Sequence, residues 1–280
     1  MVVVFVLDNY LSETDGTNIS AHRFRDELIK RGHTVRVVAV DVEGPDMYGL
    51  REHYVPIATP VAKRSHMRFG KFDKEIVTRA FDGADVVHVF FPFQLGRKSF
   101  GLAKKMGIPV CGAFHCQPEN VTYNIGLKYF GFIAGFLYWV FRVLLYGRLK
   151  NIHCPSAFLA GELKKHRYGA RLHIISNGVS SCFKPAEQPA RRADTTINVL
   201  MIGRLAPEKR QDLIINAVKH SRYRDKIQLY FAGNGANQKK YAALAAALPN
   251  PPVFEFLPQE RLLQLIQKTD IYIHASDIEI

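Results

Sequence analysis

Short apolar runs alternate with amphipathic stretches along the whole chain. The first run, Val2 to Leu7, is an unbroken, largely β-branched segment, which predicts a strand buried on both faces of a parallel sheet. A polar loop from Asp8 to Thr17 follows, and then apolar residues at helical spacing predict a helix from about Ile19 to Arg31, ended by Gly32. This strand, loop and helix cycle is typical of a doubly wound α/β sheet with helices on both faces.

The same cycle recurs through the first two thirds of the chain. The predicted helices are Phe100 to Met106 and Ser156 to His166, with a long helical stretch before the second. The predicted strands are His33 to Val40, Ala84 to Phe91, Ile108 to Phe114, Asn151 to Cys154 and Leu172 to Ile175.

A second series of strands and helices begins at Ile197, after a segment rich in proline and charge. We therefore expect a first Rossmann-like domain over 1–180, a linker over 181–196 and a second Rossmann-like domain over 197–280. Because the sequence given stops directly after a predicted strand, we expect this second domain to be incomplete within it. Its predicted strands are Ile197 to Ile202, Ile227 to Ala232, Pro252 to Leu257 and Asp270 to Ala275.

The composition is that of a globular protein with a basic surplus. Hydrophobic residues make up 48% and charged residues 22% of the 280 positions, so two cores can be buried. Lys and Arg number 38 against 25 Asp and Glu, a net charge of +13 that favours nucleotide phosphates, acidic lipids or nucleic acid. We expect no nucleic-acid partner, because the chain has no helix-turn-helix, zinc or RNP-type signature and the charge is spread over both domains.

The cysteines and the N-terminus favour a cytoplasmic protein. The four cysteines are scattered without a CxxC pair or metal-ligand spacing, so we expect reduced thiols, no metal and no cofactor. Cys116 beside His115 is either a nucleophile or a bystander thiol, and the bystander is favoured. The apolar N-terminal run has no basic region before it and no small-residue cleavage site, which predicts a strand and not a signal peptide.

The segment from Ile197 to Arg210 carries the strongest candidate chemistry. Gly203 ends a predicted buried strand, and Arg204 and Lys209 lie five residues apart before the next helix. A helix N-terminus offers free N–H groups, Arg can grip phosphate oxygens with two donors, and Lys adds a point charge, so the segment suits a diphosphate. From these residues alone, two solvated surface cations are an equally good explanation.

Six segments in chain order resemble the family 4 glycosyltransferases of the GT-B fold. None is specific by itself, but together they cover almost the full length of the chain. They are Asp15-Gly16-Thr17, Phe114-His115, Asn177-Gly178-Val179, Gly203-Arg204 with Pro207-Glu208-Lys209 and Asp212-Leu213-Ile214, Ala232-Gly233-Asn234-Gly235, and Ala275-Ser276-Asp277-Ile278-Glu279.

This resemblance implies a retaining transferase with its active site in the cleft between two Rossmann-like domains. A nucleotide-sugar donor would bind mainly to the second domain, with Arg204 and Lys209 neutralising the diphosphate and backbone N–H groups around Gly16 approaching it from the first. Asp15 precedes Gly16 where the family has a second glycine, so this contact departs from the family pattern. The glycine turn at Gly233 either brings backbone near the nucleotide or merely makes a strand-helix turn.

Three further positions follow from the resemblance. His115 would lie beside the transferred sugar, and its place after a predicted strand is where open α/β sheets bind ligands. Glu279 matches the first glutamate of a pair that contacts the sugar and the ribose, and the second glutamate would lie beyond Ile280. We therefore expect the ribose contact to be missing from the chain as given. Side chains around Leu257, together with the part expected beyond Ile280, would select the base and the sugar.

The stretch from Tyr129 to Gly147 is apolar and aromatic with a single charge, Arg142. A membrane span is disfavoured, because it would put two halves of one sheet on opposite sides of a bilayer, so we expect a buried or interfacial helix. The alternatives are a packed core helix and a helix that seats the protein on the inner face of an anionic cell membrane, where a lipid or lipid-linked glycan would be the acceptor. The basic residues that favour the membrane are Lys63, Arg64, Arg68, Lys71, Lys74, Lys128, Arg142, Arg148 and Lys150.

Other functions remain as alternatives. A dinucleotide-dependent enzyme is disfavoured, because the loop after the first strand lacks G-x-G-x-x-G. A non-catalytic relative or truncated binding fragment of the same fold, and a GT-B epimerase acting on nucleotide-sugars, are the two competing hypotheses. Release of nucleoside diphosphate from a donor would exclude the first, and product stereochemistry would separate the second.

Overall fold

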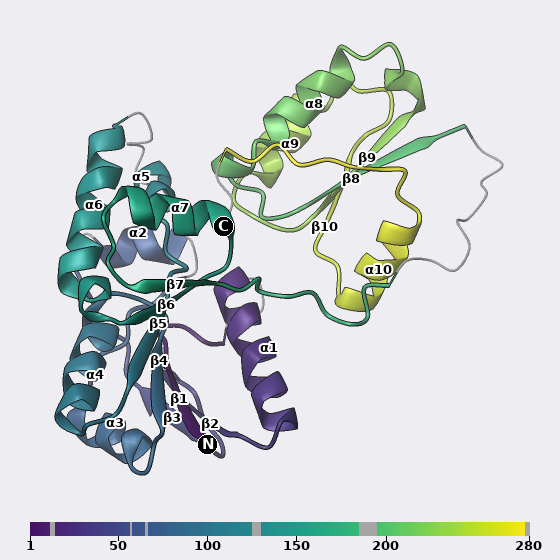
Figure 1. Ribbon diagram of the computed structural model, residues 1–280. Coiled ribbons are helices and arrows are strands. Elements are labelled where there is room, and N and C mark those ends of the chain that lie inside the picture. The colour runs from purple at the N-terminus through teal and green to yellow at the C-terminus, as the bar shows by residue number, and fades with distance from the viewer. Residues whose placement is uncertain (12–14, 57, 65–66, 125–129, 185–194, 278–280) are drawn as a thin grey trace. The chain divides into compact units, whose positions relative to one another are not determined.

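The computed structural model describes residues 1–11, 15–56, 58–64, 67–124, 130–184 and 195–277, and the chain divides into two compact units, Met1–Gly178 and Val179–Glu279 (Figure 1). The first unit is built on a seven-stranded sheet of parallel strands in the order β3-β2-β1-β4-β5-β6-β7. Its strands are β1 Val2–Val6, β2 Thr34–Val40, β3 Met47–Leu50, β4 Val86–Val89, β5 Val110–Ala113, β6 Asn151–Cys154 and β7 Arg171–Ile174.

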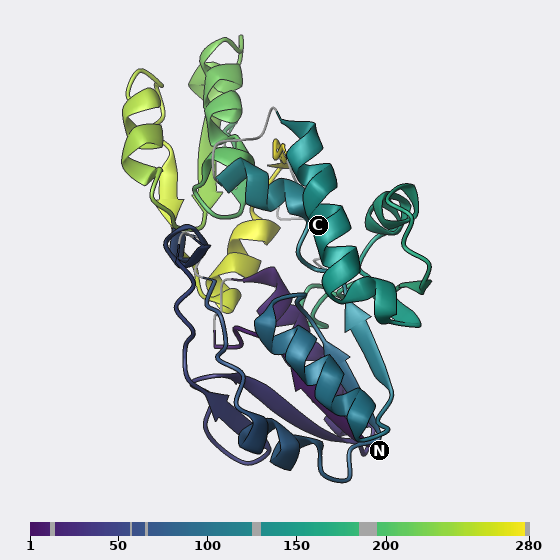
Figure 2. The same ribbon diagram turned by 90° about the vertical axis from the view of Figure 1, so that its left-hand side faces the viewer.

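Helices cover both faces of the first sheet. Helix α1 packs through Ala21, Phe24 and Leu28 on one face, whereas α3, α4, α6 and α7 cover the other (Figure 1). Figure 2 looks onto the face that carries α3, α4 and α6. The Val-rich strands are buried from both sides, as their unbroken apolar runs require. The helices are α1 Gly16–Lys30, α2 Ala58–Arg64, α3 Lys74–Phe81, α4 Gln94–Lys105, α5 Pro118–Asn124, α6 Gly131–Leu144, η1 Tyr146–Arg148 and α7 Ala157–Lys165.

The second unit repeats the architecture on a smaller scale. Its parallel strands run in the order β10-β9-β8-β11, with α8 and α9 packed on one face and α10 on the other. The strands are β8 Ile197–Ile202, β9 Ile227–Ala232, β10 Val253–Glu255 and β11 Ile271–Tyr272. The helices are η2 Pro207–Lys209, α8 Gln211–Lys219, η3 Arg224–Lys226, α9 Gln238–Leu244 and α10 Gln259–Gln267.

The predicted α/β architecture of two Rossmann-like units is confirmed. Strands predicted at Asn151–Cys154, Ile197–Ile202 and Ile227–Ala232 have those bounds in the structure. The predicted helix Phe100 to Met106 is too short, because α4 begins at Gln94. The linker over 181–196 stays a prediction, since most of it lies outside the described residues.

Helix α6 has one buried face and one exposed face. Ala134, Tyr138 and Phe141 face the core of the first unit. The opposite side of α6 exposes a stripe of apolar side chains. Among the residues that the structure describes, no helix is long and apolar enough to cross a bilayer. This apolar stripe comprises Phe132, Phe136, Trp139 and Val143, which are 74%, 58%, 50% and 45% exposed.

Candidate functional site

The loop after β8, residues 203–210, packs closely on the loop after β9. A Cβ on Gly233 would stand 2.1 Å from the carbonyl oxygen of Gly203, and one on Gly235 would stand 2.5 Å from that of Leu205. The Leu205 N–H donates to the Asn234 carbonyl at 2.8 Å. The two glycines therefore let two backbones touch at the carboxyl edge of the sheet, a purpose that the sequence did not reveal.

Arg204 is held at this edge by a buried acid. Its Nη2 lies 2.9 Å from Oε1 of Glu208, whose side chain is 5% exposed, while Gln211 donates from Nε2 to the Arg204 carbonyl at 2.8 Å. The Arg204 side chain is 36% exposed and has donors beyond the one that Glu208 uses. An anion at this edge can therefore meet a fixed guanidinium.

Lys209 lies in a short 3₁₀ turn two residues before α8, ahead of the next helix as the sequence predicts. Arg210 intervenes in a left-handed conformation with φ of 54°, and α8 begins at Gln211. The Lys209 side chain still lies beside the strand end, because its Cδ is 3.9 Å from where a Gly203 Cβ would stand. The two predicted cations are thus brought to one loop.

The end of the described chain is tied to the same loop. The Asp277 N–H donates to the Glu208 carbonyl at 2.9 Å, and the Asp277 carboxylate lies 3.0 Å from Nη1 of Arg210. Arg210 donates hydrogen bonds to the carboxylates of Asp212 and Asp277, and these bonds raise its pKa. Glu279, the predicted sugar contact, lies outside the described residues.

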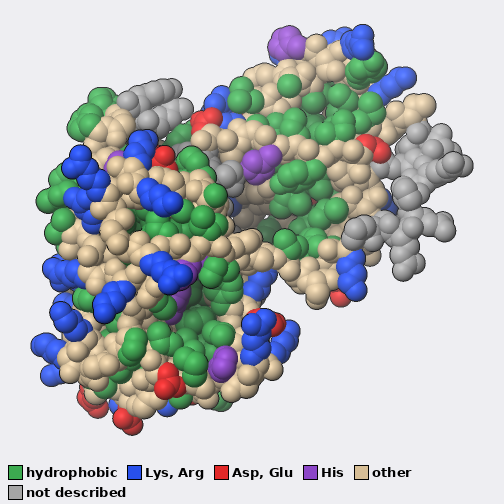
Figure 3. All heavy atoms as spheres, in the orientation of Figure 1, with side chains coloured by type: hydrophobic (Ala, Val, Ile, Leu, Met, Phe, Trp, Pro, Cys, Tyr) green, Lys and Arg blue, Asp and Glu red, His purple; other side chains and the backbone are tan. Residues whose placement is uncertain are grey.

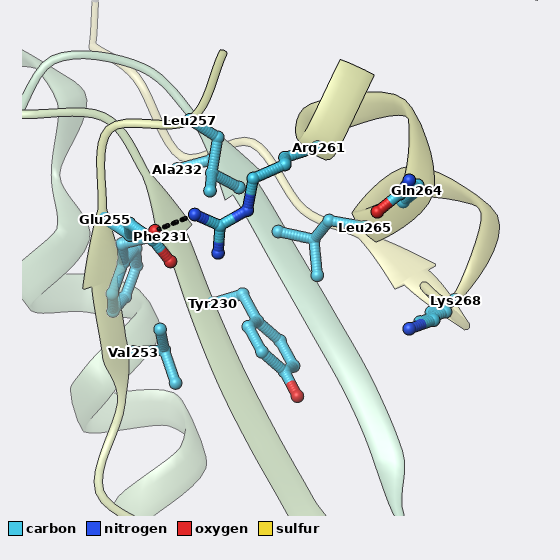
Figure 4. A pocket seen from close by; sticks show the side chains of 10 residues that line it. All are labelled: Tyr230, Phe231, Ala232, Val253, Glu255, Leu257, Arg261, Gln264, Leu265 and Lys268. Atoms are coloured by element: carbon cyan, nitrogen blue, oxygen red, sulfur yellow. Dashed lines mark ion pairs between the residues drawn. The ribbon is translucent and has the colours of Figure 1, made fainter. Parts of the chain in front are cut away.

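Leu257 borders a cavity of about 230 Å³ on the α10 face of the second sheet (Figure 4). The Arg261 guanidinium reaches across from α10 to Glu255, at 2.9 Å between Nη1 and Oε1. The Gly233 N–H donates to the Glu255 carbonyl at 2.8 Å, which ties the cavity to the glycine loop. The cavity is lined by Tyr230, Phe231, Ala232, Val253, Glu255, Leu257, Arg261, Gln264, Leu265 and Lys268.

In the first unit, Asp15 occupies the N-terminus of α1. Its Oδ1 accepts the N–H of Thr17 at 2.8 Å and that of Asn18 at 3.2 Å, an N-cap that satisfies two donors of the first turn. Gly16 is exposed, and within the described chain a Cβ there would meet no atom within 4 Å. This chain thus has an aspartate where the family has a second glycine. The Asp15 carboxylate occupies N–H groups next to Gly16, where backbone N–H groups were expected to approach phosphate.

His115 is buried two residues after β5 and is 4% exposed. Its ring stacks on Phe90 with centroids 5.8 Å apart and meets the edge of His153 at 5.5 Å. Burial, with smaller contributions from His153 and His88, lowers the pKa of His115 to about 3, so the imidazole is neutral at physiological pH. Nε2 has no hydrogen-bond partner within the described chain.

Three more polar groups lie at this edge, of which His153 and Asp8 were not identified from the sequence. His153 bonds to the Ile175 carbonyl at 2.6 Å through Nε2, which must therefore carry the proton. Gln117, which the sequence offers as one of the polar groups after His115 that could face the acceptor or the sugar, is 4% exposed with an unpartnered Oε1. Asp8 follows β1 and is 1% exposed. Asp8 could have been found from the sequence as a site candidate, because it is a polar residue directly after a predicted buried strand.

The predicted residues thus form two groups, each at the carboxyl edge of its own sheet. Arg204, Lys209 and Gly233 share one edge with Leu257 near them, and Gly16 and His115 belong to the other. Within the described chain no three His, Cys, Asp or Glu side chains are placed to hold a metal ion. The first group can bind an anion and the second can bind neutral hydroxyl groups.

Both units of the chain match families of known proteins. The profile of Glycosyltransferase Family 4 matches residues 14–181, more than half of the chain, and that of Glycosyl transferases group 1 matches residues 184–279. A GDP-mannose-dependent alpha-mannosyltransferase of Mycolicibacterium smegmatis is 28% identical over the whole chain and 74% of its own length. An alpha-monoglucosyldiacylglycerol synthase of Streptococcus pneumoniae is 23% identical over 97% of the chain and 65% of its own length.

Solved structures share the fold. HepE from Anabaena, in complex with UDP-glucose, superposes with a TM-score of 0.61 at 15% identity, over 99% of this chain and 74% of that protein. A lipopolysaccharide outer core galactosyltransferase, WaaB, gives a TM-score of 0.64 at 13% identity, over 100% of this chain and 75% of that protein. At these identities the likeness concerns the GT-B fold.

Proposed function

Because the chain belongs to glycosyltransferase family 4, we propose that it transfers a sugar from a nucleotide-diphosphate sugar to a lipid or lipid-linked glycan, with retention of anomeric configuration. The observation that carries the proposal is the loop 203–210, where Arg204 and Lys209 both lie at the carboxyl edge of the second sheet. Departure of a nucleoside diphosphate leaves negative charge on the phosphate, and fixed cations stabilise that charge as it develops. Retention is the stereochemistry that the family resemblance implies.

The cavity beside Leu257 supports a place for the nucleobase. Its walls combine apolar surface from Leu257 and Leu265 with polar ends from Glu255, Arg261 and Gln264, a mixture typical of sites that bind planar ligands with a few fixed hydrogen bonds. The hydrogen bond from Gly233 to Glu255 links this wall to the loop that would hold the diphosphate. GDP-mannose and UDP-glucose are the first donors to test, given the names of the relative and the bound structure.

Two features support a membrane lipid as acceptor. The apolar stripe of α6 is exposed, and Figure 3 shows hydrophobic side chains with Lys and Arg side chains among them on the side of the first unit where α6 lies. The buried face of the same helix reaches the segment after His115, because the Tyr138 hydroxyl donates to Oε2 of Glu119 at 3.1 Å. A helix lying on an anionic bilayer would thus bring the sugar-binding edge near lipid headgroups.

The transfer hypothesis is tested by incubating the protein with GDP-mannose, UDP-glucose and UDP-galactose. Each donor is offered with and without vesicles that contain dioleoylglycerol or phosphatidylinositol, and free nucleoside diphosphate is measured. We expect release with at least one donor, stimulated by one acceptor, and an α-linked product by NMR. No release from any donor would contradict the proposal, and a product of inverted configuration would contradict retention.

The membrane hypothesis is tested by vesicle sedimentation of the double variant Phe132→Ser/Phe136→Ser. We expect the wild type to sediment with phosphatidylglycerol vesicles at low salt and less so at high salt, and the variant to lose roughly ten-fold in affinity. The matched control is Phe158→Ser on α7, where the Phe158 side chain is 59% exposed outside the apolar stripe. Equal binding by the double variant and the control would remove α6 as the membrane surface.

A further inference from the structure

Glu255 and Arg261 form an ion pair on the wall of the cavity beside Leu257. Glu255 ends β10 and Arg261 lies in the first turn of α10, with Nη1 of the arginine 2.9 Å from Oε1 of the acid. The side chains are 41% and 60% exposed, so a ligand can reach both. An exposed pair contributes little to folding stability, so the two charges are available for another purpose.

The pair retains hydrogen-bonding capacity that faces the cavity. A carboxylate accepts through several lone pairs and a guanidinium carries several N–H donors, and the ion pair uses only one of each. In Figure 4 the second oxygen of Glu255 and the second terminal amino group of Arg261 point the same way, into the space between Val253 and Tyr230. The wall therefore presents acceptors followed directly by donors.

The rest of the cavity suits a flat ring system. Its volume of about 230 Å³ lies below the roughly 300 Å³ of sites that enclose a whole drug-sized ligand, so it has room for one part of a nucleotide. The Tyr230 ring and the Leu265 side chain form walls against which the faces of a base can pack. A planar ligand held there would meet the ion pair with its edge.

The cavity also lies at a suitable distance from the loop that carries Arg204. β10 is the second neighbour of β8 in the sheet, so the ends of these strands are about 10 Å apart at the usual strand spacing. Glu255 is the last residue of β10, and Gly203 and Arg204 follow β8 directly. The ribose and the diphosphate of a nucleotide whose base contacts Glu255 can therefore run along the sheet edge toward Arg204.

We propose that Glu255 and Arg261 select guanine, so that the donor is a GDP-sugar, an inference that rests on the proposed transfer function. The Glu255 carboxylate accepts from N1–H and from the 2-amino group of the base, and the Arg261 guanidinium donates to O6 or N7. Guanine carries these two donors next to these two acceptors along one edge, in the order that the ion pair requires.

The other common bases lack this order. Uracil has a single N–H between two carbonyl oxygens, so one of its oxygens would face the Glu255 carboxylate, where two acceptors repel each other. Adenine and cytosine have one amino group beside a ring nitrogen that accepts, so they too would place an acceptor against Glu255. A site that loses a hydrogen bond to the wrong ligand and leaves its own polar group unpaired discriminates strongly against that ligand.

The test measures the Kd of GDP, inosine diphosphate and UDP by calorimetric titration, for wild type and Glu255→Gln. Inosine diphosphate has the N1–H and O6 of guanine but lacks the 2-amino group, so its affinity relative to GDP isolates one bond to Glu255. We expect wild type to bind GDP about 10-fold more tightly than inosine diphosphate and at least about 100-fold more tightly than UDP. Glu255→Gln should bind GDP about 30-fold more weakly and prefer it to inosine diphosphate by less than about three-fold.

The matched control is Glu260→Gln, which removes an exposed carboxylate of α10 that does not line the cavity. It should keep the wild-type preference for GDP. The inference is overturned if wild type binds UDP as tightly as GDP, or if Glu255→Gln weakens GDP and inosine diphosphate by the same factor, as a merely structural contact would. Either result leaves sugar transfer from another donor intact, whereas a wild type that binds no nucleoside diphosphate would overturn the proposed function and this inference with it.

Discussion

The two sheets end in chemically opposite edges. In the second unit the carboxyl edge carries Arg204 and Lys209 on a loop that is locked by glycine contacts and by a buried acid. In the first unit the corresponding edge holds His115 and Gln117, which are buried and uncharged, together with Asp8. One architecture thus yields an edge suited to an anionic leaving group and another suited to hydroxyl groups. The fold places both sites, and the side chains decide what each can bind.

The largest expected effect concerns Asp8 and folding stability. Burial raises the pKa of Asp8 to about 7, so the folded state binds more protons than the unfolded state between pH 3.8 and about 7. The contribution of Asp8 to stability falls as pH rises through this window and is constant above it. Asp8→Asn should therefore gain up to about 4 kcal/mol over wild type at pH 8 and little at pH 4. Urea unfolding at both pH values measures the difference.

His88 and His115 change the folding stability with pH in the opposite direction from Asp8. Variant and wild type are therefore compared at the same pH. Burial lowers the pKa of both to about 3, so their contribution to stability is lost as pH falls below 6.5. They are unchanged in Asp8→Asn and cancel in the difference. An Asp8→Asn variant that is less stable than wild type at pH 8 would mean that the carboxylate supports the fold, contrary to the contrast between the two edges.

The next effect concerns the cationic edge. Lys209→Ala should lower the transfer rate by about 100-fold, or about 3 kcal/mol in transition-state stabilisation, because it removes a positive charge that we propose to lie beside the diphosphate. Steady-state kinetics with the donor that proves active measures it. Lys219→Ala, which removes an exposed cation from the other end of α8, is the matched control and should be neutral. Equal activity of the two variants would contradict the proposal that the cationic edge binds the diphosphate.

A smaller effect is expected from the glycine contact between the loops. Gly233→Ala should destabilise the second unit by about 2 kcal/mol, because its Cβ would collide with the Gly203 carbonyl and one of the two loops must shift. Gly101→Ala on α4 is the control, since a Cβ there meets no described atom within 4 Å and alanine favours a helix. Thermal unfolding followed by calorimetry separates the two. A Gly233→Ala variant as stable as Gly101→Ala would show that the two loops can shift apart without loss of stability.

The smallest effect concerns Asp15. Asp15→Ala should cost about 1 kcal/mol of stability, because the N–H groups of Thr17 and Asn18 lose their cap. The same change frees those two donors for a phosphate, so we expect slightly tighter binding of the nucleoside diphosphate by calorimetric titration. Asp73→Ala, which removes the N-cap of α3, should match the loss of stability without changing binding. Weaker nucleotide binding by Asp15→Ala would instead make the carboxylate part of the donor site.

Much of the fold could be predicted because buried parallel strands carry a strong local signal. The run Ile197–Ile202 is apolar at almost every position, because helices cover both faces of its sheet. Its bounds could therefore be predicted from the sequence. β3 was missed, because Met47–Leu50 is a four-residue strand at the sheet edge with partly exposed side chains. Helix α3 was also missed, although Asp73 caps it, because only eight residues carry its pattern.

The site was predicted less completely, since its geometry depends on contacts between distant segments. Arg204 and Lys209 could be named from their spacing, but the buried partner Glu208 and the collision that Gly233 avoids require the folded loops. Asp8 stood in the sequence as the first polar residue after a strand. Its burial and its bond to Gly70, 62 residues away, are properties of the assembled sheet.

The stacked pair of Phe136 and Trp139, with ring centroids 5.7 Å apart on α6, also has a spectroscopic consequence. Trp139 is the single tryptophan of the chain, so tryptophan emission originates entirely from the first unit. An unfolding curve recorded by fluorescence will follow that unit alone, whereas circular dichroism will average both. Disagreement between the two curves is therefore a direct measure of whether the units unfold together or apart.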